Sequence, residues 1–465
     1  MTTATTVLQD MASFPPTHET SLGIPWEDMV LLLQSINLHG NSLTTAHILG
    51  NYSQFQIVDG QYTNEHLQGR KLKMRHRHTE GTVNYQPRIH KFGILFTPNP
   101  LANVWNPSPP NLAINYEDTI LLTDNERVPL TSLDPTDVQK DSVGLPNHPE
   151  VTVEGDGFGG SGPGGKRLPI DAEGLVLIPG GGGFYISEQY GPYIYRFDKY
   201  GVMLSALPPP DTFIPLRRGI VDYSSNTPSK YAPSLIPYPK DPSTGRANNQ
   251  GFTGLTLSPD GKTLSAVLRS ALVQDGGDSA ATRRYTRLLT FDVTNHEWPL
   301  TGRDFVVPLP VYTDKPGEKR VATQSEIYAV SSTDYLFLTT DSGRGYGAGA
   351  ENTESLYRQI DVVSLDKAHH VHAKPYDMIN GAVAPGGILA PNIKPAEYCP
   401  FIDINNYIEL GKFGLHNGGT EDTELLNQKW ESLATGMFQS SYHHLIIQLT
   451  ESHKHPSTQL PPNTQ

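Results

Sequence analysis

Residues 173–198 read EGLVLIPGGGGFYISEQYGPYIYRFD, and they contain three short apolar runs separated by turns. The first run ends before a turn that contains four consecutive glycines, at positions 180–183. Short runs of β-favouring residues bounded by glycine and proline are typical of antiparallel strands joined by tight turns. The stretch therefore predicts a three-stranded β-meander.

The same meander pattern returns at residues 253–293 and 326–363, with weaker copies at 89–124 and 430–434. The first strands of the last four copies are expected to begin at residues 173, 253, 326 and 431. This spacing exceeds the ~40–50 residues of compact propeller repeats, so long insertions are expected between strands. Radial repetition of meanders protects sheet edges in a β-propeller. The sequence thus predicts an all-β fold, a single β-propeller with long inter-strand insertions, and a large β-sandwich is the alternative.

The composition is that of a globular chain and disfavours two classes of partner. The chain has 465 residues and a formal net charge of −13, so neither nucleic acid nor an anionic membrane is an expected partner. Its one cysteine, Cys399, excludes an internal disulfide framework and a cysteine-based zinc site. No apolar run approaches the ~18 residues of a membrane span, and no signal peptide is visible at the amino terminus. We expect a soluble monomer.

Helix signals are few. Apolar spacing predicts one short helix within residues 26–38, and the segment 421–430, which lacks glycine and proline, predicts another. The glycine-rich segment 155–165 is expected to be an exposed loop. We expect an unassigned amino-terminal segment at 1–50, the propeller domain at 51–440 and a poorly ordered tail at 441–465.

Acidic residues recur at the expected strand ends. First strands begin at Glu173, Glu326 and Glu431, and Asp124 ends a second strand in a weaker copy. The innermost strands of a propeller converge on one axial channel, so these acids are expected to form one ring. Clustered carboxylates act either as a general acid/base pair or as a Ca²⁺ site. The four residues are therefore the candidate metal ligands, with Ca²⁺ as the expected cofactor.

Three further residues are candidate catalytic groups at the mouth of the same channel. Glu188 and Asp341 end equivalent second strands, and Arg344 follows Asp341 by three residues. The planar guanidinium of Arg344 can bind a phosphate or a carboxylate, while a neighbouring carboxylate takes the proton of an attacking water. The alternative is an internal network of arginine and carboxylates that holds no ligand.

A series of motifs in this order resembles the phytase-like family, whose defining domain is described as esterase-like activity of phytase. The motifs are GFGG at 157–160, DAEGL at 171–175, SEQYGPYIYRFD at 187–198, NQGFTGLTLSPDGKTL at 249–264, QDGG at 274–277, DSGRG at 341–345, FGLHNGG at 413–419 and KWESL at 429–433. The resemblance spans residues 81–433 and is strongest to the long fungal-type members. Thr253 stands where the family usually has glutamate, and Arg269 where it commonly has glutamine, which makes this edge more positive.

This resemblance implies a six-bladed propeller, a hydrolase-like activity on phosphate esters, and a secreted or vacuolar location. We therefore expect a phytase-like hydrolase that acts on a small-molecule phosphate ester at the channel mouth, with metal assistance. A non-catalytic propeller that binds a ligand or a protein is the first alternative. A carboxylic-ester hydrolase is the second.

Overall fold

The computed structural model describes residues 55–59, 82, 84–96, 101, 103–107, 112–139, 147–297, 299–315, 317–372, 375–433, 436–438 and 441–443. They form several antiparallel sheets, and the one α-helix among them is α2 (Tyr407–Gly411). Its N-cap, Asn406, accepts hydrogen bonds from the backbone N–H groups of Ile408 and Glu409. None of the described helices has the length and apolar content needed to cross a membrane. The fold is all-β, as the sequence predicts.

Three four-stranded sheets form the centre of the fold, and each follows chain order from strand to strand. Their strands are β7 (Ala172–Leu177), β8 (Phe184–Glu188), β9 (Ile194–Phe197) and β10 (Met203–Leu207); β13 (Phe252–Leu257), β14 (Thr263–Leu268), β15 (Tyr285–Asp292) and β16 (Leu300–Pro308); and β19 (Thr323–Ala329), β20 (Asp334–Thr340), β21 (Arg358–Ser364) and β22 (Glu397–Asp403). The first three strands of each sheet are the predicted meanders. The fourth strands were not predicted.

The remaining strands form smaller sheets. They are β1 (Phe55–Asp59), β2 (Arg88–Phe96) and β3 (Leu112–Leu121); β4 (Asp137–Gln139), β5 (His148–Val153) and β6 (Gly165–Arg167); and the pairs β11 (Leu216–Arg217) with β12 (Ile220–Val221), β17 (Val311–Thr313) with β18 (Lys319–Val321), and β23 (Gly436–Phe438) with β24 (Ser441–His443). The weak copy at 89–124 is therefore confirmed as β2 and β3. The glycine-rich loop between β5 and β6 is mostly exposed, as expected.

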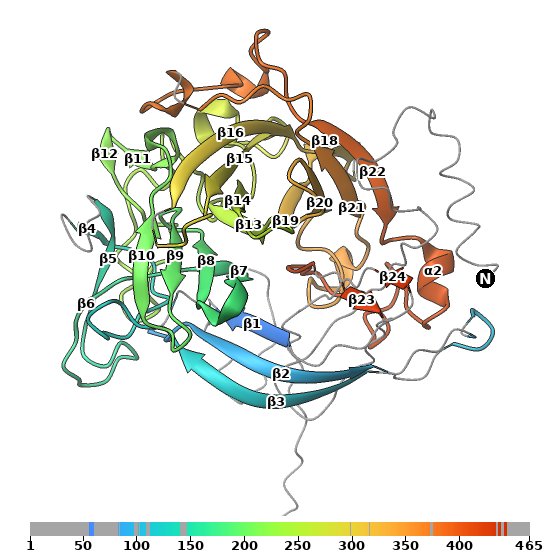
Figure 1. Cartoon of the computed structure of the whole chain (residues 1–465), viewed down its shortest axis with the longest axis horizontal. Helices are drawn as coiled ribbons and strands as arrows, with labels where there is room; N and C mark the ends of the chain where they lie inside the picture. The colour runs from blue at the N-terminus through green and yellow to red at the C-terminus, as the bar shows by residue number, and fades with distance from the viewer. Residues whose placement is uncertain are drawn as a thin grey trace, which may run out of the picture.

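The three large sheets lie around a common centre (Figure 1). Strands β7, β13 and β19 are nearest the centre, and β10, β16 and β22 are farthest from it. Apolar side chains fill the space between neighbouring sheets. Tyr185 and Leu264 belong to one buried cluster, and Val267 and Phe337 belong to the next. The core is thus divided among the interfaces between sheets rather than gathered in one layer.

Close contact between the innermost strands depends on a small residue at one position. A Cβ atom at Gly174 would lie 2.5 Å from the Cβ of Leu255 on the neighbouring strand. Further along, the backbone N–H of Ala329 donates to the Oγ1 of Thr256 at 2.9 Å. Strand β13 is therefore in direct contact with both β7 and β19.

Two segments differ from the sequence-based expectation. Residues 421–430 form turns and isolated bridges, not a helix, because Leu425 pairs with His416 and Asn427 pairs with Tyr346. Within the expected tail, Ser441–His443 forms strand β24. The helix predicted at 26–38 and the remainder of the tail, 444–465, lie outside the described residues.

Candidate active site

The starts of the innermost strands and the ends of the second strands meet at one end of the sheets. Antiparallel register pairs Ala172 with Glu188, Phe252 with Leu268, and Thr323 with Thr340. Two groups of charged side chains lie at or beyond these pairs. We call them the carboxylate cluster (Asp171, Glu173, Glu326 and Glu431) and the arginine cluster (Arg269, Arg283, Arg320 and Arg344).

The carboxylate cluster unites three of the four predicted metal ligands and adds Asp171. Burial, followed by the charge of Glu188, raises the pKa of Asp171 to about 8. Burial, together with the charges of Asp171 and Glu431, raises the pKa of Glu173 well above its usual value. Burial and Glu431 also raise the pKa of Glu326 to about 8, although two backbone N–H groups oppose this shift. Asp171 and Glu326 therefore favour protonated forms near neutral pH.

Glu431 and Asp124 are not placed as expected. Glu431 lies on an irregular segment before β23 and begins no strand, but it is close enough to act on Glu173 and Glu326. Asp124 follows β3 in a turn, where its Oδ1 accepts hydrogen bonds from the backbone N–H groups of Glu126 and Val128. The described contacts of Asp124 are confined to this turn.

Basic side chains compensate the carboxylate cluster. Lys429 and Arg269 both lower the pKa values of Asp171 and Glu173. Thr253, at the departure from the family pattern, is buried, and its Oγ1 accepts a hydrogen bond from the Nε2 of Gln324. Among the described side chains, no three His, Cys, Asp or Glu residues are placed to hold one metal ion. Arg269 and Lys429 thus supply part of the positive charge that a bound Ca²⁺ would supply.

Glu188 is enclosed by its own loop. Its side chain has no exposed area, and it accepts hydrogen bonds from the backbone N–H groups of Tyr190, Gly191 and Tyr193 at 2.5–3.0 Å. Burial raises the pKa of Glu188 to about 7. None of these contacts involves Arg344, so the two residues do not form the expected pair. The position of Glu188 indicates a role in holding the loop.

The loop that carries Arg344 packs closely on a distant segment of the chain. Ser342 and Gly343 have positive φ angles of 45° and 68°, and Gly345 has a φ of 122°. A Cβ atom at Gly345 would lie 2.4 Å from the carbonyl oxygen of Leu426. Only glycine permits this approach, which lets the N–H of Tyr346 donate to the same carbonyl at 2.7 Å.

Arg358 connects this loop to the segment that carries Lys429 and the cluster residue Glu431. Its Nη2 donates to the carbonyl oxygens of Arg344 at 2.9 Å and Asn427 at 3.1 Å. Its guanidinium also lies 5.0 Å from the centre of the Trp430 ring. The fully buried Arg358 therefore holds the two sides of the site together through backbone contacts.

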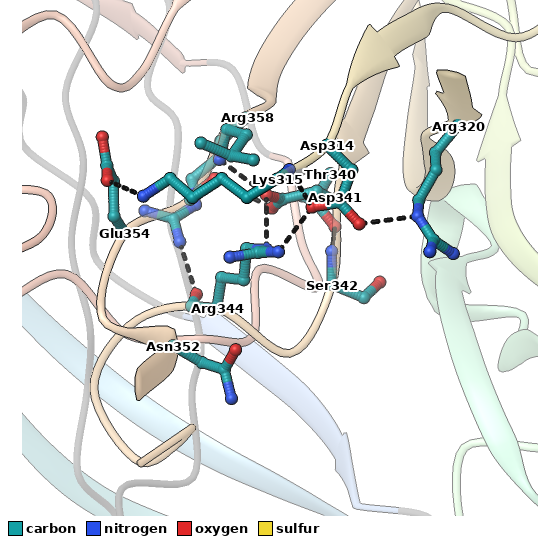
Figure 2. A network of polar contacts seen from close by, with 12 residues as sticks. Asp314, Lys315, Arg320, Thr340, Asp341, Ser342, Arg344, Asn352, Glu354 and Arg358 are labelled. Carbon is teal, nitrogen blue, oxygen red and sulfur yellow. Dashed lines mark hydrogen bonds and ion pairs between the residues drawn. The ribbon is translucent and has the colours of Figure 1, made fainter. Parts of the chain in front are cut away.

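Two members of the arginine cluster, Arg344 and Arg320, contact nearby carboxylates. Arg344 contacts Asp314 at 2.6 Å and Asp341 at 3.6 Å, and Arg320 contacts Asp314 at 2.6 Å (Figure 2). Burial and the charges of Arg269 and Arg320 lower the pKa of Arg283 to about 10. Arg269 acts on both Arg283 and Glu173, so it links the two clusters.

Several of these residues were missing from the sequence-based site. Asp171 and Lys429 lie within quoted family motifs, and Arg269 was noted there only as a departure from the pattern. Arg283, Arg320 and Asp314 lie on insertions for which the sequence offered no functional signal. Their place in the site follows from how those insertions fold back onto the sheet ends.

The raised carboxyl pKa values predict that acid stabilises the fold. The pKa values of Asp171, Glu326 and Glu188 are higher in the folded chain, so between about pH 4.5 and 8 the folded state binds more protons than the unfolded state. The free energy of unfolding is therefore expected to fall by at least ~2 kcal/mol from pH 5 to pH 8. Denaturant titrations across this range measure it. The variant Glu326→Gln should show a flatter pH dependence, whereas stability that rises with pH in the wild type would contradict the expectation.

Comparisons with known proteins agree with the sequence motifs. Residues 103–382 match the phytase-like family model, described as "Esterase-like activity of phytase". A protein of Arthroderma benhamiae (strain ATCC MYA-4681 / CBS 112371), named "Uncharacterized secreted protein", is 45% identical over 366 residues, which are 77% of this chain and 70% of that protein. A family match over more than half of the chain, together with a relative this similar, assigns the family. The chain is a member of the phytase-like family.

Proposed function

We propose that the protein hydrolyses phosphate esters at the end of the centre where the carboxylate and arginine clusters meet. We further propose that its sheets are blades of a β-propeller, with six blades in the complete ring. The placement of β7, β13 and β19 around one centre supports this architecture (Figure 1). The proposal places the substrate at the mouth of the central channel.

The observation that carries the functional proposal is the gathering of guanidinium groups in the arginine cluster. Arg283 donates two hydrogen bonds to the carbonyl oxygen of Val321 and has two cationic neighbours. Arg344 remains 17% exposed, although it contacts Asp314. Partly exposed guanidiniums that crowd one another favour the binding of an anion, and their planar donors match the oxygens of a phosphoryl group.

A protonated carboxyl group next to bound phosphate would assist departure of the alcohol. Glu173 is half-buried, and its pKa is raised well above its usual value. In the proposed reaction, water attacks phosphorus, the P–O bond to the alcohol breaks, and Glu173 gives its proton to the leaving oxygen. The oxygen and one hydrogen of the water remain on the phosphate product, and the other proton of the water restores the Glu173 carboxyl group. The arginines stabilise the phosphoryl charge. The Asp341 side chain is only 1% exposed and lies 3.6 Å from Arg344 Nε.

The functional test is turnover by the purified full-length chain on a phosphomonoester, phytate and a carboxylic ester. We expect hydrolysis of at least one phosphate ester and none of the carboxylic ester. Hydrolysis of only the carboxylic ester would contradict the proposal and identify the protein as a carboxylic-ester hydrolase. Complete inactivity on all substrates would favour a binding protein, a reading supported by Asp314, which already neutralises part of the arginine cluster.

Calcium is tested separately by thermal unfolding. We expect the melting curves in a chelator and in millimolar Ca²⁺ to coincide, because the described carboxylates are compensated by Arg269 and Lys429. A bound ion at ~100 times its dissociation constant would add ~2.7 kcal/mol to the free energy of unfolding. A clear rise of the melting temperature in Ca²⁺ would restore the metal to the proposed reaction.

The name of the Arthroderma benhamiae relative supports an exported location for this chain as well. The proposal is tested by immunodetection of the tagged protein in culture medium and cell fractions of its host. Recovery only inside the cells would contradict export.

A further inference from the structure

The hairpin formed by β17 and β18 brings a carboxylate to the arginine cluster. Asp314 follows β17, and its backbone N–H donates to the carbonyl oxygen of Glu318 at 2.8 Å across the turn. Figure 2 shows the Asp314 side chain between the guanidiniums of Arg344 and Arg320. Its Oδ1 lies 2.6 Å from Arg344 Nη2, and its Oδ2 lies 2.6 Å from Arg320 Nε. The two carboxylate oxygens are thus divided between two cations.

Asp314 is the main partner of Arg344, even though Asp341 is closer in sequence. The Asp341 carboxylate lies 3.6 Å from Arg344 Nε and already accepts hydrogen bonds from Ser355 Oγ at 2.9 Å and Leu356 N at 2.6 Å. Among the described carboxylates, only that of Asp314 contacts the Nη2 of Arg344. A bound anion would need this same Nη2 group.

The position of Asp314 matches that of an anion's oxygens. A carboxylate with one oxygen on each of two guanidiniums makes the contacts that two oxygens of a phosphate group would make. The hairpin is attached to the cluster on its other side, where Arg283 donates to the carbonyl of Val321 in β18 at 3.2 and 3.3 Å. The Asp314 side chain can therefore leave the arginines without the loss of this attachment.

We propose that Asp314 is a built-in competitor at an anion site formed by Arg320 and Arg344. The site takes a tetrahedral phosphate group, either as inorganic phosphate or as the phosphoryl group of an ester, and this group displaces the Asp314 carboxylate. The inference rests on the proposed function for the identity of the anion. It predicts that removal of the Asp314 charge strengthens phosphate binding.

The test measures binding of inorganic phosphate by calorimetry to the full chain, the variant Asp314→Asn and a matched control, Glu318→Gln. Glu318 lies on the same hairpin and contacts Arg320 at 3.0 Å, but its side chain is 64% exposed. Loss of the competing ion pairs is expected to tighten phosphate binding about tenfold in Asp314→Asn, and less than about twofold in Glu318→Gln.

Several outcomes would overturn the inference. Equal or weaker phosphate binding by folded Asp314→Asn would show that Asp314 supports the arginines rather than competing with an anion. Equal tightening in both variants would reduce the effect to a general change in charge. If Asp314→Asn does not fold, Asp314→Ser is used, and failure of both to fold would show a structural role instead.

The inference and the proposed function fail in different ways. Tighter phosphate binding by Asp314→Asn in a protein that hydrolyses no ester would retain the anion site and reject the enzyme. Ester hydrolysis by the wild type, with weaker phosphate binding by Asp314→Asn, would retain the enzyme and reject the competitor.

Discussion

The variant Arg344→Ala is expected to lower kcat/KM for a phosphate ester by ~10²–10³-fold. Arg344 is a partly exposed guanidinium of the proposed site, so its loss removes a donor from the developing phosphoryl charge. The substitution leaves the backbone carbonyl that Arg358 contacts, and the loop should keep its path. Arg344→Lys should recover only part of the rate, because an ammonium group retains the charge but not the planar pair of donors.

The controls separate a local role from a general effect of charge. Arg303→Ala removes an exposed guanidinium on β16, the outer strand of its sheet, and should leave kcat/KM unchanged. Glu188→Gln should lower stability without a specific loss of rate, because its oxygens serve three backbone N–H groups. Wild-type turnover by folded Arg344→Ala would remove Arg344 from the reaction. A ~10²–10⁴-fold loss of rate in folded Glu188→Gln would instead make Glu188 the acid/base predicted from the sequence.

The variant Arg287→Met is expected to lower the free energy of unfolding by ~3–5 kcal/mol. The side chains of Arg287 and Asp304 have no exposed area, and two of the contacts between them lie at 2.9 and 3.0 Å. Arg287 also contacts Asp377 at 3.0 Å, which ties the insertion before β22 to the β15–β16 pair. Loss of the guanidinium leaves the Asp304 carboxylate buried without its partner. Denaturant unfolding at pH 7 measures the change.

A double variant and a surface control sharpen this expectation. Arg287→Met combined with Asp304→Leu should recover most of the lost stability, because the double variant no longer leaves the Asp304 carboxylate buried without its partner. Lys367→Met breaks an exposed contact with Glu397 at 3.1 Å and should cost less than ~1 kcal/mol. A cost for Arg287→Met as small as that of Lys367→Met would show that the buried pair contributes little.

Whether the sequence predicts a strand depends on how clear the pattern of apolar residues and turns is within that segment. Meanders such as 173–198 were predicted because their apolar runs and turns repeat within a few residues. The outer strand β22 was missed because Glu397–Asp403 contains Pro400 and is only partly buried, so it lacks a clear alternation of apolar and polar residues. The segment 421–430 was predicted to be a helix because it lacks glycine and proline. Its backbone pairs instead with Tyr346 and His416, which are distant in sequence.

The sequence by itself determined the all-β class, nine strands of the three large sheets and the family. Each of these follows from residues close together in the chain or from the equivalent register of repeated strands. Tertiary structure alone decided the rest of the site. It placed Asp314 and Arg320 beside Arg344, enclosed Glu188 and added Arg283, because these contacts depend on how long insertions fold back over the sheet ends. Local sequence patterns do not predict how these insertions fold back, because the contacts that stabilise the insertions join residues with no fixed spacing in the sequence.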